Sequence, residues 1–249
     1  MPNTSRRTSK RDLTLVAVLV VAAIGLITYL VVSPPGGDDG AAQQPAGPSG
    51  PSASQSEGSA GADESPLSGL ARRDEGDPTA LGPVDAPVTM VMYSDYRCPF
   101  CAKFSRDIEP ELIDRYVDSG QLRIEWRDFP IFGEQSEMAA RAGRAAAEQG
   151  RFWEYNRAIY EDSPERGHPD LTREVLLDYA HEVGMPDMET FTADLDDPSL
   201  DEPVREDLRQ GSSIGVSSTP TFVINGEPIL GAQPLDTFVE VIEGAAGQQ

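Results

Sequence analysis

The sequence predicts an α/β domain with a helical segment inserted between its strands, preceded by one transmembrane helix and a disordered linker. Three observations lead to this prediction. Residues 13–32 form an uncharged apolar run long enough to cross a bilayer as a helix. Residues 33–77 are mainly Gly, Pro, Ser, Ala, Gln and acidic residues, which cannot build a core. From residue 78 to 245, apolar residues recur with strand and helix periods in turn.

The N-terminal residues 1–12 carry four basic side chains against a single acid. By the positive-inside rule this tail stays in the cytoplasm, which predicts a single-pass protein of the cell membrane with an extracytoplasmic domain. A cleaved signal peptide shares the basic start and the apolar centre. The apolar run at 13–32 exceeds the usual signal-peptide core, and the Ser-Pro-Pro-Gly-Gly sequence at 33–37 is a poor cleavage site. An uncleaved signal anchor is the preferred interpretation, and the sequence leaves cleavage open.

The charge of the chain indicates which kinds of binding partner to expect. The 249 residues carry a formal net charge of −22, with 42 acidic and 20 basic side chains. Because phosphate binding depends on clustered Lys and Arg, nucleic acid is not an expected partner. The linker at 33–77 is expected to be a tether that lets the domain stand off the membrane.

The first part of the domain has the pattern strand, helix, strand. The apolar, partly β-branched run at 88–94 predicts a buried strand. A helix is expected from Phe100, because large apolar residues recur at helical spacing up to Tyr116, and Pro110 predicts a kink within it. Residues 122–129 alternate with period two, which predicts the second strand.

The stretch from 136 to 211 is rich in Ala, Glu, Arg and Leu and is broken by Gly and Pro, which predicts a series of helices. The expected helices lie near 136–148, 151–162, 171–183, 188–194 and 201–211. After the insertion, 221–224 and 227–230 predict two strands joined by a tight turn at Asn225–Gly226. A last helix is expected from about 234 to 243.

The chain has two cysteines, Cys98 and Cys101, at the predicted junction of the first strand and the helix. Their spacing on a first helical turn lets them bridge and reopen without unfolding the chain. The helix N-terminus presents unpaired N–H groups and a positive dipole end to Cys98, which stabilises its thiolate. Pro99 suits this first turn, where no N–H donor is needed. The pattern predicts an oxidising redox pair in which Cys101 is the resolving sulfur.

Two other roles for the cysteines stay open at this point. A zinc site needs four ligands, and beyond the two thiols the chain offers only His168 and His181. A structural disulfide is compatible with export, but a bridge that closes so small a loop adds little stability. No metal and no cofactor is expected beyond the cysteine pair itself. Among the charged neighbours, Arg97 is expected to favour the Cys98 thiolate, and Asp95 is expected to oppose it if its side chain points the same way.

Three segments carry a family resemblance. They are Asp85–Thr89 (Asp-Ala-Pro-Val-Thr), Ser94–Cys101 (Ser-Asp-Tyr-Arg-Cys-Pro-Phe-Cys) and Ser218–Gly226 (Ser-Thr-Pro-Thr-Phe-Val-Ile-Asn-Gly). Together they resemble the DsbA-like branch of the thioredoxin superfamily, in its membrane-anchored bacterial form. The resemblance covers residues 78–243, and the combination of segments is specific.

The resemblance implies a thioredoxin fold whose helical domain is inserted between the second and third core strands. It also implies that Cys98 is the attacking cysteine and Cys101 its partner. Pro220 is implied to follow a cis peptide bond, which leaves the backbone of Thr219 to pair with an extended substrate segment. From the residues alone, a trans bond before Pro220 is the default.

At two positions this chain departs from the family, which limits how far the family's properties apply to it. Some relatives carry a buried acid six residues before the first cysteine, where this chain has Met92. Cys101 is then expected to lose its proton to water or to Glu125. The active-site dipeptide, Pro99–Phe100, lacks the histidine of the strongest oxidants, which leaves the redox potential open.

The predicted function is that of an extracytoplasmic thiol:disulfide oxidoreductase, an oxidase that forms disulfides in exported proteins. The expected partners are exported proteins with cysteine thiols, a membrane redox partner that reoxidises the pair, and the membrane itself through the N-terminal helix. One alternative is a reductase or isomerase; isomerases usually dimerise, and no dimerisation domain is visible. The other is a tethered peptide-binding module with a structural disulfide. We expect the sulfur of Cys98 to be exposed, which favours an oxidoreductase over a peptide-binding module.

Overall fold

The computed structural model describes residue 67 and residues 69–247. The predicted cytoplasmic tail, the predicted span at 13–32 and most of the predicted linker lie outside the described residues. Within the described part of the chain, no helix combines the length and the apolar character needed to cross a bilayer.

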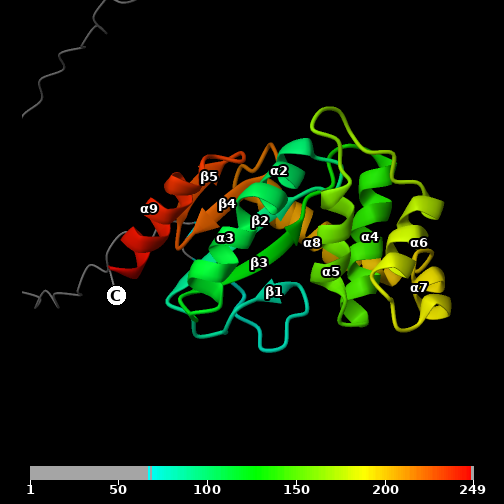
Figure 1. Ribbon diagram of the computed structural model, residues 1–249, viewed down its shortest axis with the longest axis horizontal. Coiled ribbons are helices and arrows are strands. Elements are labelled where there is room, and N and C mark those ends of the chain that lie inside the picture. The colour runs from blue at the N-terminus through cyan, green and yellow to red at the C-terminus, as the bar shows by residue number, and fades with distance from the viewer. Residues whose placement is uncertain (1–66, 68, 248–249) are drawn as a thin grey trace, which may run out of the picture. The chain divides into compact units, whose positions relative to one another are not determined.

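The strands of the described chain form one mixed five-stranded sheet in the order β1-β3-β2-β4-β5 (Figure 1). Their bounds are β1 Ala80–Leu81, β2 Val88–Ser94, β3 Leu122–Asp128, β4 Thr221–Ile224 and β5 Glu227–Leu230. β2 and β3 are parallel, and the other three pairings are antiparallel. Every residue of β2 and β3 is buried, as expected for central strands covered on both faces. The two-residue β1 is not predicted from the sequence, because it is too short to show a period.

The chain between β2 and β3 is helical. It forms α2 Pro99–Asp107, α3 Glu109–Leu112 and the π-helix η1 Ile113–Val117. The helix breaks at Ile108, where φ is −124°, and Pro110 lies in the first turn of α3, where its missing N–H costs no helical hydrogen bond. The predicted kink is therefore present, just before the proline. In Figure 1, α2 lies in front of β2.

The segment between β3 and β4 is a helical insertion. Its elements are α4 Glu134–Glu148, α5 Phe152–Glu161, α6 Arg173–Glu182, α7 Met188–Asp194, the 3-10 helix η2 Pro198–Leu200 and α8 Asp201–Ser213. All predicted helices are present, with ends shifted by at most two residues. Figure 1 shows α4 to α7 gathered beside the sheet, and aromatic contacts join the two parts, because Trp126 of β3 packs against Phe152 and Tyr160 of α5. The predicted α/β class with a helical insertion is confirmed.

The tight turn between β4 and β5 also forms as predicted. Asn225 and Gly226 have φ of 45° and 95°, the left-handed values that a two-residue hairpin turn of this kind requires. The Asn225 side chain accepts a hydrogen bond from the Thr89 N–H at 2.9 Å and donates one to the Pro87 carbonyl at 3.1 Å. The final helix, α9 Leu235–Ala246, follows this hairpin.

The sheet separates two apolar clusters, because side chains of a strand alternate between its faces. Met90 and Met92 of β2 lie in the larger cluster, which contains both cysteines. Val91 and Tyr93 lie in the smaller cluster on the opposite face.

The folded domain begins earlier than the sequence predicts. Leu70 is only 8% exposed and belongs to the smaller cluster. The backbone N–H groups of Arg72 and Arg73 donate to the Glu125 carboxylate at 2.9 and 2.8 Å, and the Arg72 guanidinium pairs with the buried Asp207. The predicted linker boundary at residue 77 is therefore wrong, since buried carboxylates hold this polar segment in place.

Candidate active site

The two cysteines lie at the start of α2, directly after β2. β2 ends at Ser94, and a turn closed by a 3.0 Å hydrogen bond from the Cys98 N–H to the Asp95 carbonyl leads into the helix. Cys98 is the N-cap residue, with an extended backbone (φ −84°, ψ 118°), and Pro99 lies in the first turn. The predicted position of the motif between a strand and a helix is confirmed.

The Cys98 thiol is far more acidic than an ordinary cysteine. A hydrogen bond from the Cys101 side chain lowers the pKa of Cys98 to about 6, although burial acts in the opposite direction. The Thr219 hydroxyl, which is buried without another hydrogen-bond partner, and the N–H groups of Cys101 and Phe100 lower this pKa further. At neutral pH Cys98 is therefore mainly a thiolate, as its position at a helix N-terminus predicts.

Cys101 has the opposite character. Burial raises the pKa of Cys101 well above its ordinary value, and the neighbouring Cys98 raises it further. The Ser94 hydroxyl and the Asp95 N–H act in the other direction, each through a hydrogen bond. The pair thus combines one stable thiolate with one thiol that retains its proton.

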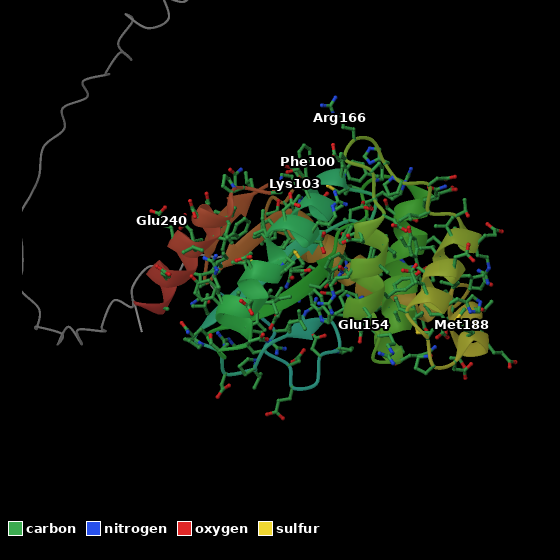
Figure 2. All side chains as sticks on the ribbon, viewed as in Figure 1. Phe100, Lys103, Glu154, Arg166, Met188 and Glu240 are labelled. Atoms are coloured by element: carbon green, nitrogen blue, oxygen red, sulfur yellow. The ribbon has the colours of Figure 1, made fainter. Side chains whose placement is uncertain are left out.

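The sulfur of Cys98 is less accessible than the sequence suggests. Cys98 is 2% exposed, and its Sγ lies 3.2 Å from the Thr219 carbonyl oxygen, to which the thiol form donates. The expectation of an exposed sulfur is wrong, because the loop before β4 packs directly on the motif. Phe100 is 60% exposed, and Figure 2 shows its side chain next to that of Lys103 at the edge of the domain.

The Thr219–Pro220 peptide bond is cis, as the resemblance implies. Both residues are buried, and β4 begins at the next residue. The Pro220 carbonyl accepts a hydrogen bond from the Gly231 N–H at 2.8 Å. The fold therefore brings Thr219 to Cys98 across 121 positions of sequence.

Arg97 does not act on Cys98 as expected, and the carboxylate of Asp95 is bonded elsewhere, so the condition for its opposing effect is not met. The Arg97 guanidinium donates to backbone carbonyls of the two loops that flank the motif. Asp95 accepts hydrogen bonds from three backbone N–H groups and from the Ser136 hydroxyl. Burial raises the pKa of Asp95, and these hydrogen bonds oppose the rise. The two side chains hold the surrounding loops, while hydrogen-bond partners set the pKa of Cys98.

Glu125 lies on the wrong face of the sheet to accept a proton from Cys101. Its neighbours in β3, Ile124 and Trp126, line the cluster that contains the cysteines, so Glu125 points the other way. There, despite burial, two backbone N–H donors and two arginine side chains lower the pKa of Glu125 to about 2. The expectation that Glu125 serves Cys101 is wrong. Met92, which stands where some relatives carry a buried acid, does lie in the cluster that contains the cysteines.

Two hydroxyl groups near Cys101 are not predicted from the sequence. The Ser94 hydroxyl, which lowers the pKa of Cys101, lies 3.0 Å from the Tyr160 hydroxyl, and the Tyr160 hydroxyl donates to the Asp95 carbonyl at 3.1 Å. The period-two pattern of β2 would identify Ser94, because it places this residue on the face of Met92. No local pattern identifies Tyr160, which lies 66 positions away.

The loop between α5 and α6 packs beside the motif. His168 Nδ1 lies 2.7 Å from the Arg97 carbonyl oxygen, and its ring packs against Phe132 in a tilted arrangement with the centroids 4.3 Å apart. A groove of about 370 Å³ lies along α2, with Glu165 of this loop in its lining. The residues that line the groove are Pro99, Phe100, Lys103, Arg106, Asp107 and Glu165. The open space next to the motif therefore runs along α2.

Comparison with known proteins places these features in a family. The family model described as thioredoxin matches residues 74–244. The Probable disulfide bond formation protein D of Bacillus anthracis is 31% identical over 150 residues, which cover 59% of this chain and 69% of that protein. The crystal structure of oxidised BdbD from Bacillus subtilis is similar with a TM-score of 0.64 and 28% identity, over 69% of this chain and 94% of that one. The Na(+)/H(+) antiporter NhaA of Herminiimonas arsenicoxydans is 37% identical over 164 residues, but the match covers only 25% of that protein.

Proposed function

The chain belongs to the thioredoxin family, among its DsbA-like thiol:disulfide oxidoreductases, and from that membership we propose that it is an oxidase that forms disulfides in exported proteins. The observation that carries the oxidising direction is the pKa of Cys98, which hydrogen bonds lower to about 6. A stable thiolate is a good leaving group and stabilises the reduced pair, so the Cys98–Cys101 disulfide is readily passed to substrates.

Oxidation of a substrate proceeds by two thiol–disulfide exchanges. A substrate thiolate attacks Cys98 Sγ, the Cys98–Cys101 bond breaks, and Cys101 leaves with the electron pair and takes up a proton. A second substrate thiolate then attacks the substrate sulfur of the mixed disulfide, and Cys98 leaves as a thiolate. The substrate loses two electrons and the pair gains them. A membrane redox partner then removes these electrons and restores the disulfide.

Thr219 and Pro220 are assigned to substrate binding in this proposal. The Thr219 carbonyl lies 3.2 Å from Cys98 Sγ. An extended segment that pairs with this backbone would place its cysteine beside the sulfur. The exposed ring of Phe100, in the active-site dipeptide Pro99–Phe100, offers an apolar contact to the same segment.

The redox potential of the pair tests the direction of electron flow. After equilibration with glutathione buffers, we expect a potential well above the value of about −270 mV for thioredoxin and closer to the value of about −120 mV for DsbA. A potential near or below that of thioredoxin would contradict the oxidase and favour a reductase.

One variant distinguishes an oxidoreductase from a tethered peptide-binding module. Cys98→Ser removes the attacking sulfur and leaves the backbone at Thr219 in place. An oxidoreductase loses its oxidation of a reduced peptide in this variant, whereas a binding module keeps its full activity.

The proposal includes an N-terminal membrane anchor that holds the domain outside the cytoplasm. Its support is the basic tail at 1–12 and the uncharged apolar run at 13–32. Residues from 33 up to the start of the folded domain are then the tether. We expect the full chain to stay in the membrane pellet after alkaline extraction, and a chain that starts at residue 33 to be released. Release of a shortened natural product would contradict the uncleaved anchor.

A further inference from the structure

The sulfur of Cys101 lies in an apolar environment with a hydroxyl group beside it. Cys101 is 2% exposed and belongs to the same cluster as Met92 and Trp126. Ser94 is two residues after Met92 in β2, so its side chain lies on the same face of the sheet. From there its hydroxyl lowers the pKa of Cys101 as a hydrogen-bond donor, against the effect of burial.

The Ser94 hydroxyl is itself held by α5. Ser94 Oγ lies 3.0 Å from Tyr160 Oη, and Tyr160 Oη donates to the Asp95 carbonyl at 3.1 Å. Ser94 and Tyr160 are 2% and 1% exposed. The ring of Tyr160 stacks on Tyr96 with the centroids 5.6 Å apart. Burial raises the pKa of Tyr160 well above its ordinary value, so this hydroxyl stays neutral and available as a donor.

The carboxylates nearest to this position are engaged elsewhere. Asp95 directs its carboxylate to backbone N–H groups and to Ser136, and only its own N–H faces Cys101. Glu109, whose pKa burial raises to about 7, accepts from the Ser105 hydroxyl further along the helix. Glu125 lies across the sheet. The titratable side chains that face Cys101 are Cys98 at the N-cap of α2 and Tyr160 of α5, with Tyr96 and Asp95 close to Tyr160.

On the basis of the proposed oxidoreductase function, we propose that Ser94 donates the hydrogen bond that stabilises Cys101 in its thiolate state, and that Tyr160 is the positioning residue that holds Ser94 in place. A hydrogen bond to the charged form of a group favours that form, and it is stronger where water is excluded.

This hydrogen bond acts when the pair recloses during reoxidation. In a mixed disulfide between Cys98 and a partner, the Cys101 thiol gives its proton to water, and the thiolate attacks Cys98 Sγ. The Cys98–Cys101 bond forms, the bond to the partner breaks, and the partner sulfur leaves with the electron pair. While Cys101 is charged, the Ser94 O–H points at its sulfur, and the Tyr160 O–H turns from the Asp95 carbonyl to Ser94 Oγ.

The pKa of Cys101 tests this proposal directly. In a full chain with Cys98→Ser, Cys101 is the sole cysteine, since the chain has two. In protein labelled with ¹³C at cysteine, the chemical shift of the cysteine Cβ then follows the titration of Cys101 alone, without interference from the seven tyrosines. We expect Ser94→Ala to raise the Cys101 pKa by about one unit, and Tyr160→Phe to raise it by less. The matched control is Ser105→Ala. Ser105 is also a buried serine, but it lies on α2 and bonds to Glu109, so we expect no shift in the pKa of Cys101.

The rate of reclosure is a second readout, measured with both cysteines present. Reduced protein is mixed with oxidised glutathione, and the release of glutathione from Cys98 is followed across pH. We expect Ser94→Ala to slow this release about tenfold at neutral pH. Ser94→Thr keeps the hydroxyl and should restore the rate, which a purely structural role of Ser94 does not explain.

An unchanged Cys101 pKa in both Ser94→Ala and Tyr160→Phe overturns the proposal, and so does an equal shift in Ser105→Ala. If Ser94→Ala fails to fold, as judged by circular dichroism, Tyr160→Phe carries the test, because it keeps the ring and removes only the hydroxyl. The failure of the proposed function gives a different result. In that case the unaltered protein does not oxidise a reduced peptide, while the titration of Cys101 still reports on Ser94.

Discussion

Cys98 and Cys101 are three residues apart, yet their thiols differ in acidity because one helical turn separates two environments. Cys98 caps α2 and receives hydrogen bonds from N–H groups of the first turn, from the Cys101 side chain and from the Thr219 hydroxyl. Cys101 points into the apolar cluster, where burial is the largest influence on its pKa and raises it. The asymmetry therefore follows from the hydrogen bonds that Cys98 receives and from the burial of Cys101, and not from the charges of Arg97 and Asp95.

The alkylation rate of Cys98 is expected to reach half its maximum at a pH of about 6, the lowered pKa of Cys98, where an ordinary cysteine does so at about 8.5. Below this midpoint Cys98 is a thiol, and the rate falls. Cys101→Ala removes the largest cause of the lowering, so the midpoint should move to higher pH. Iodoacetamide labelling across a pH series measures both values, and an equal midpoint in the two proteins contradicts the assigned cause.

Cys101→Ala is also expected to trap substrates. Without the resolving sulfur, the mixed disulfide on Cys98 persists unless a second substrate thiol reaches it. Exported proteins should then appear as adducts on a non-reducing gel. The double variant Cys98→Ser, Cys101→Ala provides the control, since it has no sulfur to trap with. Adducts of equal amount in the control would show that they do not depend on Cys98.

At the scale of elements, α4 packs against the segment that carries the motif through a glycine. A Cβ atom on Gly143 would lie 2.3 Å from the hydroxyl oxygen of Tyr96, which is 1% exposed. Tyr96 in turn stacks on Tyr160 and packs against Trp126. This contact fixes the distance between the inserted helices and the turn before Cys98.

Gly143→Ala should therefore destabilise the domain by about 1–3 kcal/mol, the usual cost of overpacking a core. Urea denaturation measures the change. The matched control is Gly244→Ala in α9, where the added Cβ meets no atom within 4 Å, and there we expect no loss of stability because alanine favours helices. Equal stabilities of the two variants would contradict the assigned role of Gly143.

At the scale of the whole molecule, the segment before β1 forms part of the fold. It supplies two backbone N–H donors to Glu125 and one guanidinium to Asp207, both of which are fully buried. Arg127, also fully buried, donates to the Leu70 carbonyl. Removal of this segment would leave buried carboxylates short of partners.

A chain that starts at residue 78 is expected to be less stable than one that starts at residue 67. Two hydrogen bonds to a buried charge are lost, each worth about 1.5–3 kcal/mol, so a loss of about 3 kcal/mol or more is expected. Urea midpoints of the two truncated chains give the difference. Equal midpoints would show that the segment packs on the domain without supporting it.

The sequence predicts features that depend on neighbouring residues, and it misses contacts between residues that are far apart in the chain. Apolar periods predict the inserted helices and all strands of the sheet except β1. The sequence Cys98-Pro99-Phe100-Cys101 predicts the redox motif at the start of a helix. The bond between Ser94 and Tyr160 spans 66 positions, and that between Arg72 and Asp207 spans 135. Such contacts depend on which faces meet after folding, which a local period does not encode. The face of Glu125, by contrast, is encoded locally, because the alternation of β3 places it opposite Ile124 and Trp126, and the expectation that it serves Cys101 disregards that alternation.

The opposed acidities of the two cysteines also decide how a mixed disulfide on Cys98 is partitioned. Two sulfurs compete for it, Cys101 and the second thiol of the substrate, because the chain has no third cysteine. Cys101, whose pKa is raised well above its ordinary value by burial, is rarely a thiolate at neutral pH. An exposed substrate thiol, with a pKa of about 8.5, is ionised more often. The partition ratio therefore favours release of a substrate with its disulfide completed over its return in the reduced form.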